Sequence, residues 1–302
     1  MSRPALIEEL LARGPVLTDG AWGTELQSRG LEAGDLPDFW NLQHPDRVES
    51  VARAYVEAGS QVILTNTFRA NRIALGRHPE VDRVAEVNRA GVEISRRAAE
   101  GRARVFASMG PCGKLLLMGE VDTAELREAF VEQAQALASG GADAIVIETM
   151  SELAEAELAI EAARSTGLPV VACMAFDSGK QNERTMMGVT APQAARALSD
   201  AGADVVGANC GAGIEDYIAI CASLASATEQ PIWIKPNAGL PELEGSEVVY
   251  RTSPEAFARD VRKLVEAGAK FVGGCCGTSP RFIEAVRREL GTREARGPSE
   301  DA

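Results

Sequence analysis

Three cysteines lie where apolar, strand-like runs of the sequence end. Cys275 and Cys276 are adjacent in the segment GGCCGT, and Cys210 lies far upstream in GANCG. Three thiolates brought together would supply three of the four ligands of a tetrahedral Zn²⁺ ion, and an open fourth position is typical of a catalytic zinc site. Such an ion can bind an incoming thiol as its thiolate, which makes that thiol a nucleophile at neutral pH.

Packing is the alternative interpretation of these cysteines. A single cysteine at a strand end is usually a small buried apolar residue, and Cys112, Cys173 and Cys221 are interpreted in this way. For the adjacent pair, packing and metal binding carry equal weight at this point. Neighbouring side chains on a regular strand face opposite sides, so both can reach one metal only where the backbone bends. The glycines that flank the pair permit such a bend.

The elements that must position these residues follow a regular alternation. Eight short runs rich in β-branched residues alternate with segments of helical periodicity. The predicted strands are Val16–Asp19, Val62–Asn66, Val105–Met109, Ala144–Glu148, Val170–Phe176, Val205–Cys210, Ile232–Asn237 and Phe271–Cys275. This pattern predicts a single-domain α/β protein, a (β/α)8 TIM barrel over residues 1–290, followed by a flexible tail over residues 291–302. A doubly wound open sheet is the alternative, but DGAWGT after the first run is not its usual Gly-rich phosphate turn.

Helix start and stop signals support this division. The spacing of apolar residues predicts a helix with one buried stripe over residues 48–56, ended by Gly59. Ser253 and Pro254 are predicted to begin another helix, which Gly268 ends. The connections that follow strands are long, notably Gly110–Asp122, Asp177–Thr190 and Ala238–Ser253. In a (β/α)8 barrel these loops build the functional face, which is formed by the carboxyl ends of the strands.

Polar residues gather at the predicted strand ends, where a barrel would bring them around one mouth. Besides the three cysteines, they are Asp19, Thr65, Glu148 and Asn237. Asp19 and Glu148 have an equally weighted alternative role as salt-bridge partners or as charges at helix N-termini. Asn237 has an alternative role as a turn residue. A barrel therefore predicts a zinc site at its C-terminal face, beside two carboxylates.

Composition excludes several classes of partner. The chain of 302 residues carries a formal net charge of −13, which argues against binding to nucleic acid or to an anionic membrane. No segment approaches the roughly 18 apolar residues of a membrane span, and the N-terminus has no signal-peptide pattern. Six cysteines in a chain of this length favour a reducing compartment. We therefore expect a cytoplasmic protein.

Several motifs together resemble the homocysteine S-methyltransferase family. They are DGAWGTE at 19–25, TNTF at 65–68, Gly110-Pro111, Glu148-Thr149, Asn209-Cys210, PNAG at 236–239 and GGCCGT at 273–278. The resemblance covers about residues 5–290. The family includes betaine–homocysteine methyltransferase, S-methylmethionine-dependent enzymes and the homocysteine-binding domain of cobalamin-dependent methionine synthase. PNAG and Phe176-Asp177 are most similar to this last domain.

The resemblance implies roles for individual residues. Cys210, Cys275 and Cys276 match the zinc ligands, and Asn237 matches a fourth ligand present when substrate is absent. Asp19 and Glu148 match acids near the homocysteine amino group. The resemblance also implies that backbone amides at the mouth bind the carboxylate. We add Thr65 to the expected substrate-binding residues.

The implied reaction is the transfer of a methyl group to homocysteine, activated as a zinc thiolate, to give methionine. The donor stays open between S-methylmethionine, betaine, S-adenosylmethionine and methylcobalamin carried by another protein, since no D-x-H-x-x-G cobalamin motif is present. An onium donor favours aromatic residues at the mouth, for which Trp22, Trp40 and Phe68 are candidates. A corrinoid protein partner favours an apolar rim such as Leu115–Met118, which is equally consistent with a substrate lid or a subunit contact.

Two alternatives to this function remain at the level of sequence. One is a homocysteine-binding subunit of a multi-protein, corrinoid-dependent methyltransferase. The other is a methyltransferase that acts on a different small thiol. The oligomeric state is not predicted by any feature of the sequence.

Overall fold

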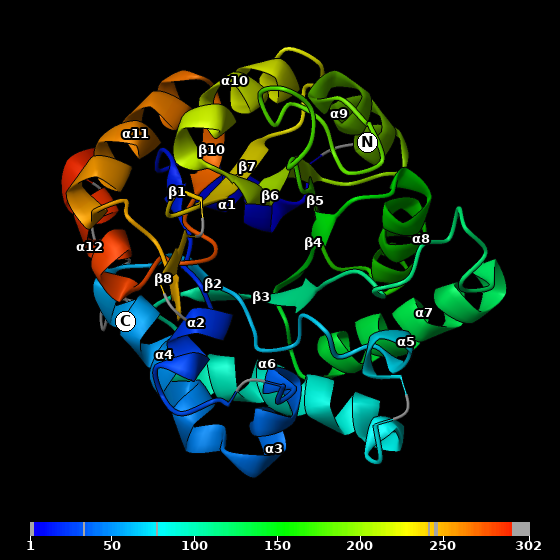
Figure 1. Cartoon of the computed structure of the whole chain (residues 1–302). Helices are drawn as coiled ribbons and strands as arrows, with labels where there is room; N and C mark the ends of the chain where they lie inside the picture. Colours follow the sequence, from blue (N-terminus) through cyan, green and yellow to red (C-terminus); the bar gives the residue numbers. More distant parts are fainter. Residues whose placement is uncertain (1–2, 33, 77, 241, 245–246, 292–302) are drawn as a thin grey trace.

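Eight parallel strands form one sheet that curls into a barrel, with helices around it (Figure 1). The computed structural model describes residues 3–32, 34–76, 78–240, 242–244 and 247–291. The order of strands in the sheet is β1-β10-β7-β6-β5-β4-β3-β2. The bounds of these strands are β1 Val16–Leu17, β2 Val62–Ile63, β3 Arg104–Met109, β4 Ala144–Met150, β5 Val170–Met174, β6 Val205–Gly213, β7 Ile232–Asn237 and β10 Ala269–Val272.

The helices alternate with the strands along the chain. The longer ones are α1 Ala5–Leu11, α4 Pro45–Ala58, α6 Val84–Ala99, α7 Thr123–Ser139, α8 Leu153–Arg164, α9 Ala191–Asp200, α10 Ile214–Ala225, α11 Pro254–Glu266 and α12 Pro280–Leu290. The short ones are α2 Gly23–Gln27, η1 Pro37–Phe39, α3 Trp40–Gln43, α5 Arg72–Leu75 and η2 Val81–Arg83. None of the helices in the described residues combines the length and apolar character needed to cross a bilayer.

The two end strands of the sheet come together and nearly close the barrel. The Gln61 backbone N–H donates to the Leu17 carbonyl at 2.7 Å, and the Leu17 N–H donates to Gln61 Oε1 at 2.9 Å. The prediction of a (β/α)8 barrel is therefore confirmed, and the open doubly wound sheet is wrong. The predicted tail over residues 291–302 lies, apart from Gly291, outside the described residues.

The strands lie where the sequence predicts them, but several are shorter. β1 ends at Leu17 rather than at Asp19, and β10 ends at Val272 rather than at Cys275. Backbone hydrogen bonds such as that from the Gly274 N–H to the Asp19 carbonyl at 3.0 Å continue beyond these points, and side chains add others. The Leu64 N–H, for example, donates to Asp19 Oδ2 at 2.7 Å instead of to a backbone carbonyl. Asp19, Cys275 and Cys276 thus lie beyond the regular strands, whereas Glu148, Cys210 and Asn237 lie within β4, β6 and β7.

The barrel interior is filled with apolar side chains below the mouth. The Trp233 ring lies between the rings of Phe106 and Phe271, with centroid distances of 6.2 and 5.3 Å. Helix α1 covers the amino-terminal end of the barrel, where Ile7 is fully buried in the same cluster. Gly207 leaves room for this packing, since a Cβ there would lie 1.9 Å from the Trp233 carbonyl oxygen. The barrel interior below the site is therefore a packed apolar core.

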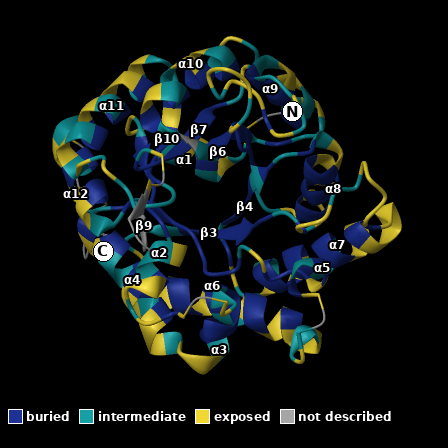
Figure 2. Cartoon of the chain, in the orientation of Figure 1, coloured by how far each residue is buried: buried dark blue, intermediate teal, exposed yellow. Residues whose placement is uncertain are grey.

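A second apolar layer lies between the barrel and its helices (Figure 2). The predicted stripe of α4 is buried, and Gly59 ends this helix with a φ of 104°. The predicted start of α11 is also confirmed, because Ser253 Oγ accepts a hydrogen bond from the Ala256 N–H at 3.2 Å. Helix N-caps and glycine ends thus set the lengths of these helices.

A short hairpin lies within the long connection predicted over Ala238–Ser253. Its antiparallel strands are β8 Glu242–Glu244 and β9 Glu247–Val249. The sequence gives no clear signal for it, because strands of three residues are too short to show alternation. The hairpin belongs to the loop between β7 and α11, on the same face as the strand ends (Figure 1).

One buried carboxyl group outside the thiol cluster predicts a pH-dependent stability effect. Asp38 is almost fully buried, its Oδ1 accepts from the Arg69 N–H at 3.0 Å, and its Oδ2 has no hydrogen-bond partner among the described residues. Burial raises the pKa of Asp38 to about 6. The folded state therefore favours the protonated form, and ionisation above that pKa costs about 3 kcal/mol of folding free energy.

We expect Asp38→Asn to stabilise the protein at pH above that value and not at acidic pH. The Asn side chain keeps an acceptor for Arg69 and carries no charge to bury. The gain in unfolding free energy should reach up to about 3 kcal/mol near neutral pH and shrink towards zero as the pH falls to the ordinary pKa of an aspartate. Urea unfolding of both proteins, near neutral pH and at a pH near the ordinary pKa of an aspartate, measures this gain. An equal change at both would show that the charge of Asp38 is not the cause.

Candidate metal and substrate site

The three predicted thiols converge at the mouth of the barrel. The sulfur atoms of Cys210, Cys275 and Cys276 all lie within 4.8 Å of one another, and those of Cys210 and Cys276 are 3.8 Å apart. A tetrahedral ion with Zn–S bonds of about 2.3 Å places its sulfur ligands about 3.8 Å apart. The spacing and chemistry of this cluster therefore fit one zinc ion, with a fourth position left for another ligand.

A left-handed backbone at the end of β6 delivers the first thiol. Cys210 has a φ of 61° and Gly211 a φ of 58°. This breaks the alternation of the strand, so that Asn209 and Cys210 both face the site although they are neighbours. The Tyr217 hydroxyl holds the bend by donating to the Cys210 carbonyl at 2.7 Å. Strain of this kind in a non-glycine residue is typical of functional sites.

A tight turn after β10 delivers the other two thiols. The Thr278 N–H donates to the Cys275 carbonyl at 3.1 Å, and Gly277 adopts a φ of 79°. The Cys276 carbonyl accepts from the Ala238 N–H at 2.9 Å, which ties the turn to the end of β7. The bend that the adjacent cysteines require is therefore present.

Asn237 connects the two cysteine segments. Its Oδ1 accepts from the Cys276 N–H at 3.1 Å, and its Nδ2 donates to the Gly211 carbonyl at 2.9 Å. The amide thus lies beside both Cys210 and Cys276 and fixes their relative position. Its role as a fourth ligand stays a prediction.

The thiol cluster favours one thiolate even without a metal. Hydrogen bonds from Cys275 and Cys276 lower the pKa of the Cys210 thiol to about 3. The same interaction with Cys210 raises the pKa of Cys276 to about 12 and that of Cys275 well above its ordinary value. A thiolate between two donor thiols is the soft, negatively charged environment that a zinc ion prefers.

A buried ion pair forms one side of the mouth. Asp19 is fully buried, and its Oδ1 accepts from Lys235 Nζ at 2.5 Å. Its Oδ2 accepts from the Trp22 indole N–H at 2.8 Å and from the Leu64 N–H at 2.7 Å. Burial opposes the charge of Lys235, but Asp19 and Glu148 outweigh it and raise the pKa of the lysine. Protein groups therefore already occupy both oxygens of Asp19.

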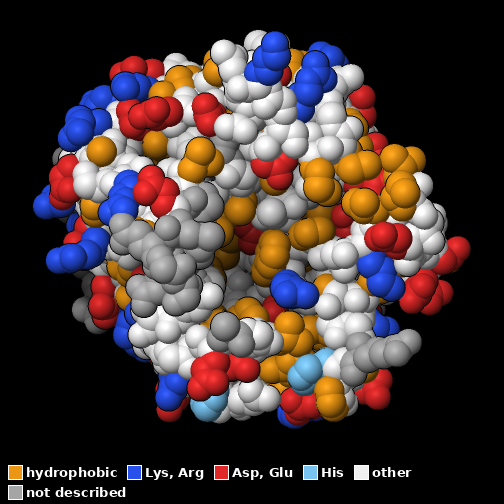
Figure 3. Space-filling model, in the orientation of Figure 1, with side chains coloured by type: hydrophobic (Ala, Val, Ile, Leu, Met, Phe, Trp, Pro, Cys, Tyr) orange, Lys and Arg blue, Asp and Glu red, His pale blue; other side chains and the backbone are white. Residues whose placement is uncertain are grey.

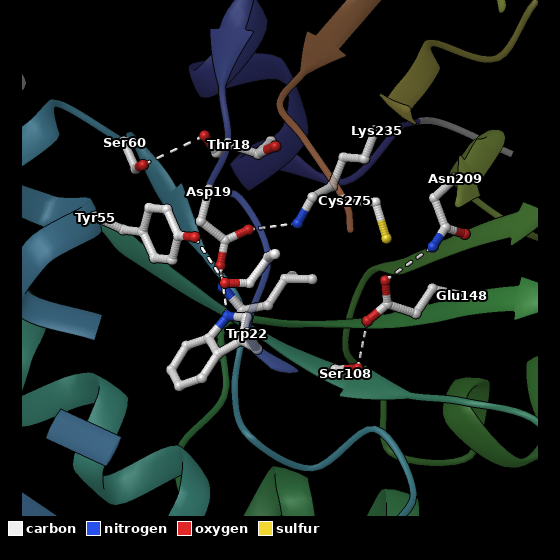
Figure 4. Close-up of polar contacts among 12 residues, drawn as sticks. Thr18, Asp19, Trp22, Tyr55, Ser60, Ser108, Glu148, Asn209, Lys235 and Cys275 are labelled. Carbon is white, nitrogen blue, oxygen red and sulfur yellow. Dashed lines mark hydrogen bonds and ion pairs between the residues drawn. The ribbon is translucent and has the colours of Figure 1, made fainter. Parts of the chain in front are cut away.

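The second predicted carboxylate lies across the mouth from this pair. Figure 4 shows Asp19 and Glu148 on opposite sides, with Lys235 and Cys275 between them. Glu148 Oε1 accepts from Ser108 Oγ at 2.5 Å, and Oε2 accepts from Asn209 Nδ2 at 3.2 Å. Burial raises the pKa of Glu148, which Lys235 and Ser108 oppose.

Thr65 contributes to the same network through Ser108. Its Oγ1 accepts from the Ser108 N–H at 3.0 Å and shares a hydrogen bond with Thr67 Oγ1 at 2.6 Å. The side chain is buried, and these contacts place the serine that holds Glu148. Thr65 therefore positions part of the site, and its contact with a substrate stays a prediction.

Sequence reasoning missed two members of the site. Asn209 bridges β6 and β4, since its Nδ2 also donates to Thr149 Oγ1 at 2.7 Å and its Oδ1 accepts from the Thr149 N–H at 2.7 Å. Lys235 is the other. A lysine inside the apolar run IWIKPN is a signal that could have identified it, because charged residues are seldom buried without a specific partner.

The aromatic candidates separate clearly. Trp22 is half-buried beside Asp19 at the mouth, whereas Trp40 is buried in the apolar layer with Arg47 against its ring. Phe68 packs so closely on Gly110 that a Cβ at that glycine would lie 2.5 Å from the ring. Packing is thus the role that the contacts of Trp40 and Phe68 support.

Together these features define a (β/α)8 barrel protein with a three-thiol cluster and two buried carboxylates at the carboxyl ends of its strands. The family model described as homocysteine S-methyltransferase matches residues 16–290. The chain belongs to that family, as its sequence motifs indicate.

Curated relatives support the family and show how much of them the chain covers. It is 32% identical over 299 residues to methionine synthase of Mycobacterium tuberculosis, covering 92% of this chain and 25% of that protein. It is 31% identical over 299 residues to methionine synthase of Mycobacterium leprae, covering 92% of this chain and 24% of that protein. The chain thus spans about a quarter of the length of these relatives.

Solved structures share the fold. The metallated form of the homocysteine methyltransferase MmuM from Escherichia coli superimposes with a TM-score of 0.76 at 23% identity, over 94% of this chain and 98% of that one. Its apo form gives a TM-score of 0.72 at 22% identity over the same shares of both chains.

Proposed function

We propose that the protein is a zinc-dependent homocysteine S-methyltransferase that forms methionine. The observation that carries this proposal is the convergence of three thiols within 4.8 Å at the mouth of a barrel of this family. A structural neighbour, the homocysteine methyltransferase MmuM, has been solved in a metallated form, which is consistent with a metal-binding member of this fold. We assign the zinc ligands to Cys210, Cys275 and Cys276, with Asn237 as the fourth ligand in the absence of substrate.

The protein's own residues then hold and orient the acceptor. A bound zinc ion would deprotonate a thiol that coordinates at its open position. We assign the ammonium group of homocysteine to Glu148, because its two oxygens each accept a single hydrogen bond from the protein. Asp19 supports this charge from across the mouth, and Thr65 acts through Ser108. Fixing the acceptor at two points brings its sulfur to a methyl donor at near-attack distance.

The methyl donor defines two versions of this function. A small onium compound such as S-methylmethionine, betaine or S-adenosylmethionine would make the chain self-sufficient, with Trp22 facing the cation. A methyl group on a corrinoid carried by another protein would make the chain an acceptor-binding component.

Exposed apolar side chains favour the corrinoid-dependent version as an alternative to the self-sufficient enzyme. In the part of the chain that the structure describes, four large apolar side chains are exposed, namely Leu117, Met118, Met186 and Leu240. All four lie in loops that follow β3, β5 and β7, on the face that carries the mouth, which is hollowed at its centre (Figure 3). The Glu152 carboxylate holds the first of these loops by accepting from the Leu116 and Leu117 N–H groups. Such a rim fits a protein that presents a methyl donor to the mouth.

Parallel assays test the proposal. Zinc-loaded chain is mixed with homocysteine and, separately, with S-methylmethionine, betaine, S-adenosylmethionine or methylcobalamin, and methionine is measured. Methionine from one small onium donor identifies a self-sufficient enzyme. Methionine from methylcobalamin alone identifies the corrinoid-dependent version. Failure to form methionine from any donor, together with failure to bind homocysteine, would contradict both versions.

A further inference from the structure

Lys235 is the buried cation of the mouth. It lies on β7, where alternation places Trp233 in the barrel interior, Lys235 above it and Asn237 beside the thiols. The lysine side chain is 3% exposed, and it is the one Lys or Arg among the described residues that is buried. Burying a charge is costly unless it is paired, so a buried lysine at this position indicates a specific role for its charge.

The ammonium group has unused hydrogen-bonding capacity. An ammonium carries three N–H donors. In the described residues its one hydrogen-bond partner is Asp19 Oδ1, which leaves two donors unused. Asp19 cannot take them at its other oxygen without displacing Trp22 or Leu64. A buried cation with two unused donors is a receptor for an anion.

Glu148 has the complementary capacity. Each of its oxygens accepts one hydrogen bond, from Ser108 and from Asn209. A carboxylate offers about four acceptor positions, so about two remain. Figure 4 shows the ends of the Lys235 and Glu148 side chains facing the same space, with the Cys275 sulfur beside them, and each of the two groups affects the pKa of the other. The mouth therefore presents one positive and one negative group, each incompletely bonded, next to the site of the sulfur.

We propose that Lys235 binds the carboxylate of the acceptor while Glu148 binds its ammonium group, so that the pair selects a thiol that is also an amino acid. This inference rests on the proposed function. The physical reason is charge balance, because a carboxylate entering a mouth with two carboxylates and a thiol cluster is repelled unless a cation receives it. Backbone amides, which the family resemblance implies for this carboxylate, then act beside Lys235.

Binding of three related thiols to zinc-loaded protein tests the inference by calorimetry, without a methyl donor. They are homocysteine, its deaminated analogue, which keeps the carboxylate, and its decarboxylated analogue, which keeps the ammonium. We expect Lys235→Met to weaken binding of homocysteine and of the deaminated analogue by about 10- to 100-fold. Binding of the decarboxylated analogue should change by less than about threefold. Glu148→Gln should weaken binding of homocysteine and of the decarboxylated analogue and leave that of the deaminated analogue nearly unchanged. Lys270→Met, which replaces an exposed lysine, should change the binding of none of the three thiols.

Three outcomes overturn the inference, two of them with Lys235→Met and one with a double variant. Lys235→Met overturns it if binding of all three thiols weakens equally or remains unchanged. Because this variant leaves Asp19 buried without its partner, Asp19→Asn combined with Lys235→Met serves as a second variant that removes both charges. The inference requires that this double variant still binds the deaminated analogue more weakly than the unmodified protein does, because that analogue has no ammonium group for Asp19 to support. Recovery of its binding, and of homocysteine binding, to the level of the unmodified protein would show that Lys235 only neutralises Asp19. Failure of the unmodified protein to bind any of the thiols would instead contradict the proposed function itself.

Discussion

We expect the Cys276→Ala variant to lose its zinc and its methyltransferase activity together. Its sulfur lies 3.8 Å from that of Cys210, so removing it leaves a site with two thiols in place of three. Apparent binding energies of about 10–16 kcal/mol for four-ligand zinc sites correspond to about 2.5–4 kcal/mol per ligand. The variant should therefore bind zinc at least about 100-fold more weakly, as measured by competition with a chelator.

Cys221→Ala is the matched control for this prediction. Cys221 is fully buried under α11, its thiol contacts the Leu264 carbonyl at 3.6 Å, and it lies outside the cluster. This variant should keep one zinc per chain and lose only the modest stability that follows from a small cavity. Retention of zinc and activity by Cys276→Ala would show that the cysteine pair serves packing rather than metal binding.

We expect Glu148→Gln to weaken homocysteine binding and to remove a pH dependence. The glutamine keeps the shape of the side chain, and its amide can donate to Ser108 Oγ while its oxygen accepts from Asn209. What it lacks is the charge that pairs with the acceptor's ammonium group, a charge-assisted interaction worth about 10- to 100-fold in affinity.

The raised pKa of Glu148 sets the direction of this pH dependence. The carboxyl group is ionised above its pKa, so the preference for homocysteine over the deaminated analogue should fall as the pH decreases through a value above that of an ordinary glutamate. The analogue lacks the ammonium group and therefore controls for effects of pH on the metal and the thiol. The preference should be small and independent of pH in Glu148→Gln. A preference that stays large in this variant would place the ammonium group elsewhere, with Asp19 as the first candidate.

The sequence predicts the barrel and the thiol cluster because both depend on local patterns. Runs such as Ala144–Glu148 are short, apolar and regularly spaced, and glycines or helix caps mark the ends of the helices between them. Cys210, Cys275 and Cys276 stand at strand ends, and the topology of parallel strands brings those ends to one face. The positions of the thiols therefore follow once the strands are identified.

The hydrogen bonds inside the mouth do not follow from local patterns. Asp19 appears in sequence as a carboxylate available to a substrate, yet Trp22, Leu64 and Lys235 already donate hydrogen bonds to its two oxygens. Lys235 comes from β7 and Asp19 from the end of β1, 216 residues away, so only the closed barrel pairs them. Asn209 is similar, because its partner Thr149 lies on another strand. Such contacts depend on tertiary distances that spacing along one chain does not encode.

X-ray absorption at the zinc edge, recorded without and with homocysteine, tests the central claim most directly. The protein is purified in the presence of zinc, and the number of sulfur neighbours of the metal is measured in both states. We expect three sulfur atoms and one lighter atom, assigned to Asn237, in the absence of homocysteine. Four sulfur atoms are expected in its presence. A sulfur count that does not rise, or a protein that retains no zinc, would contradict the assignment of this mouth as a zinc site that binds a thiol.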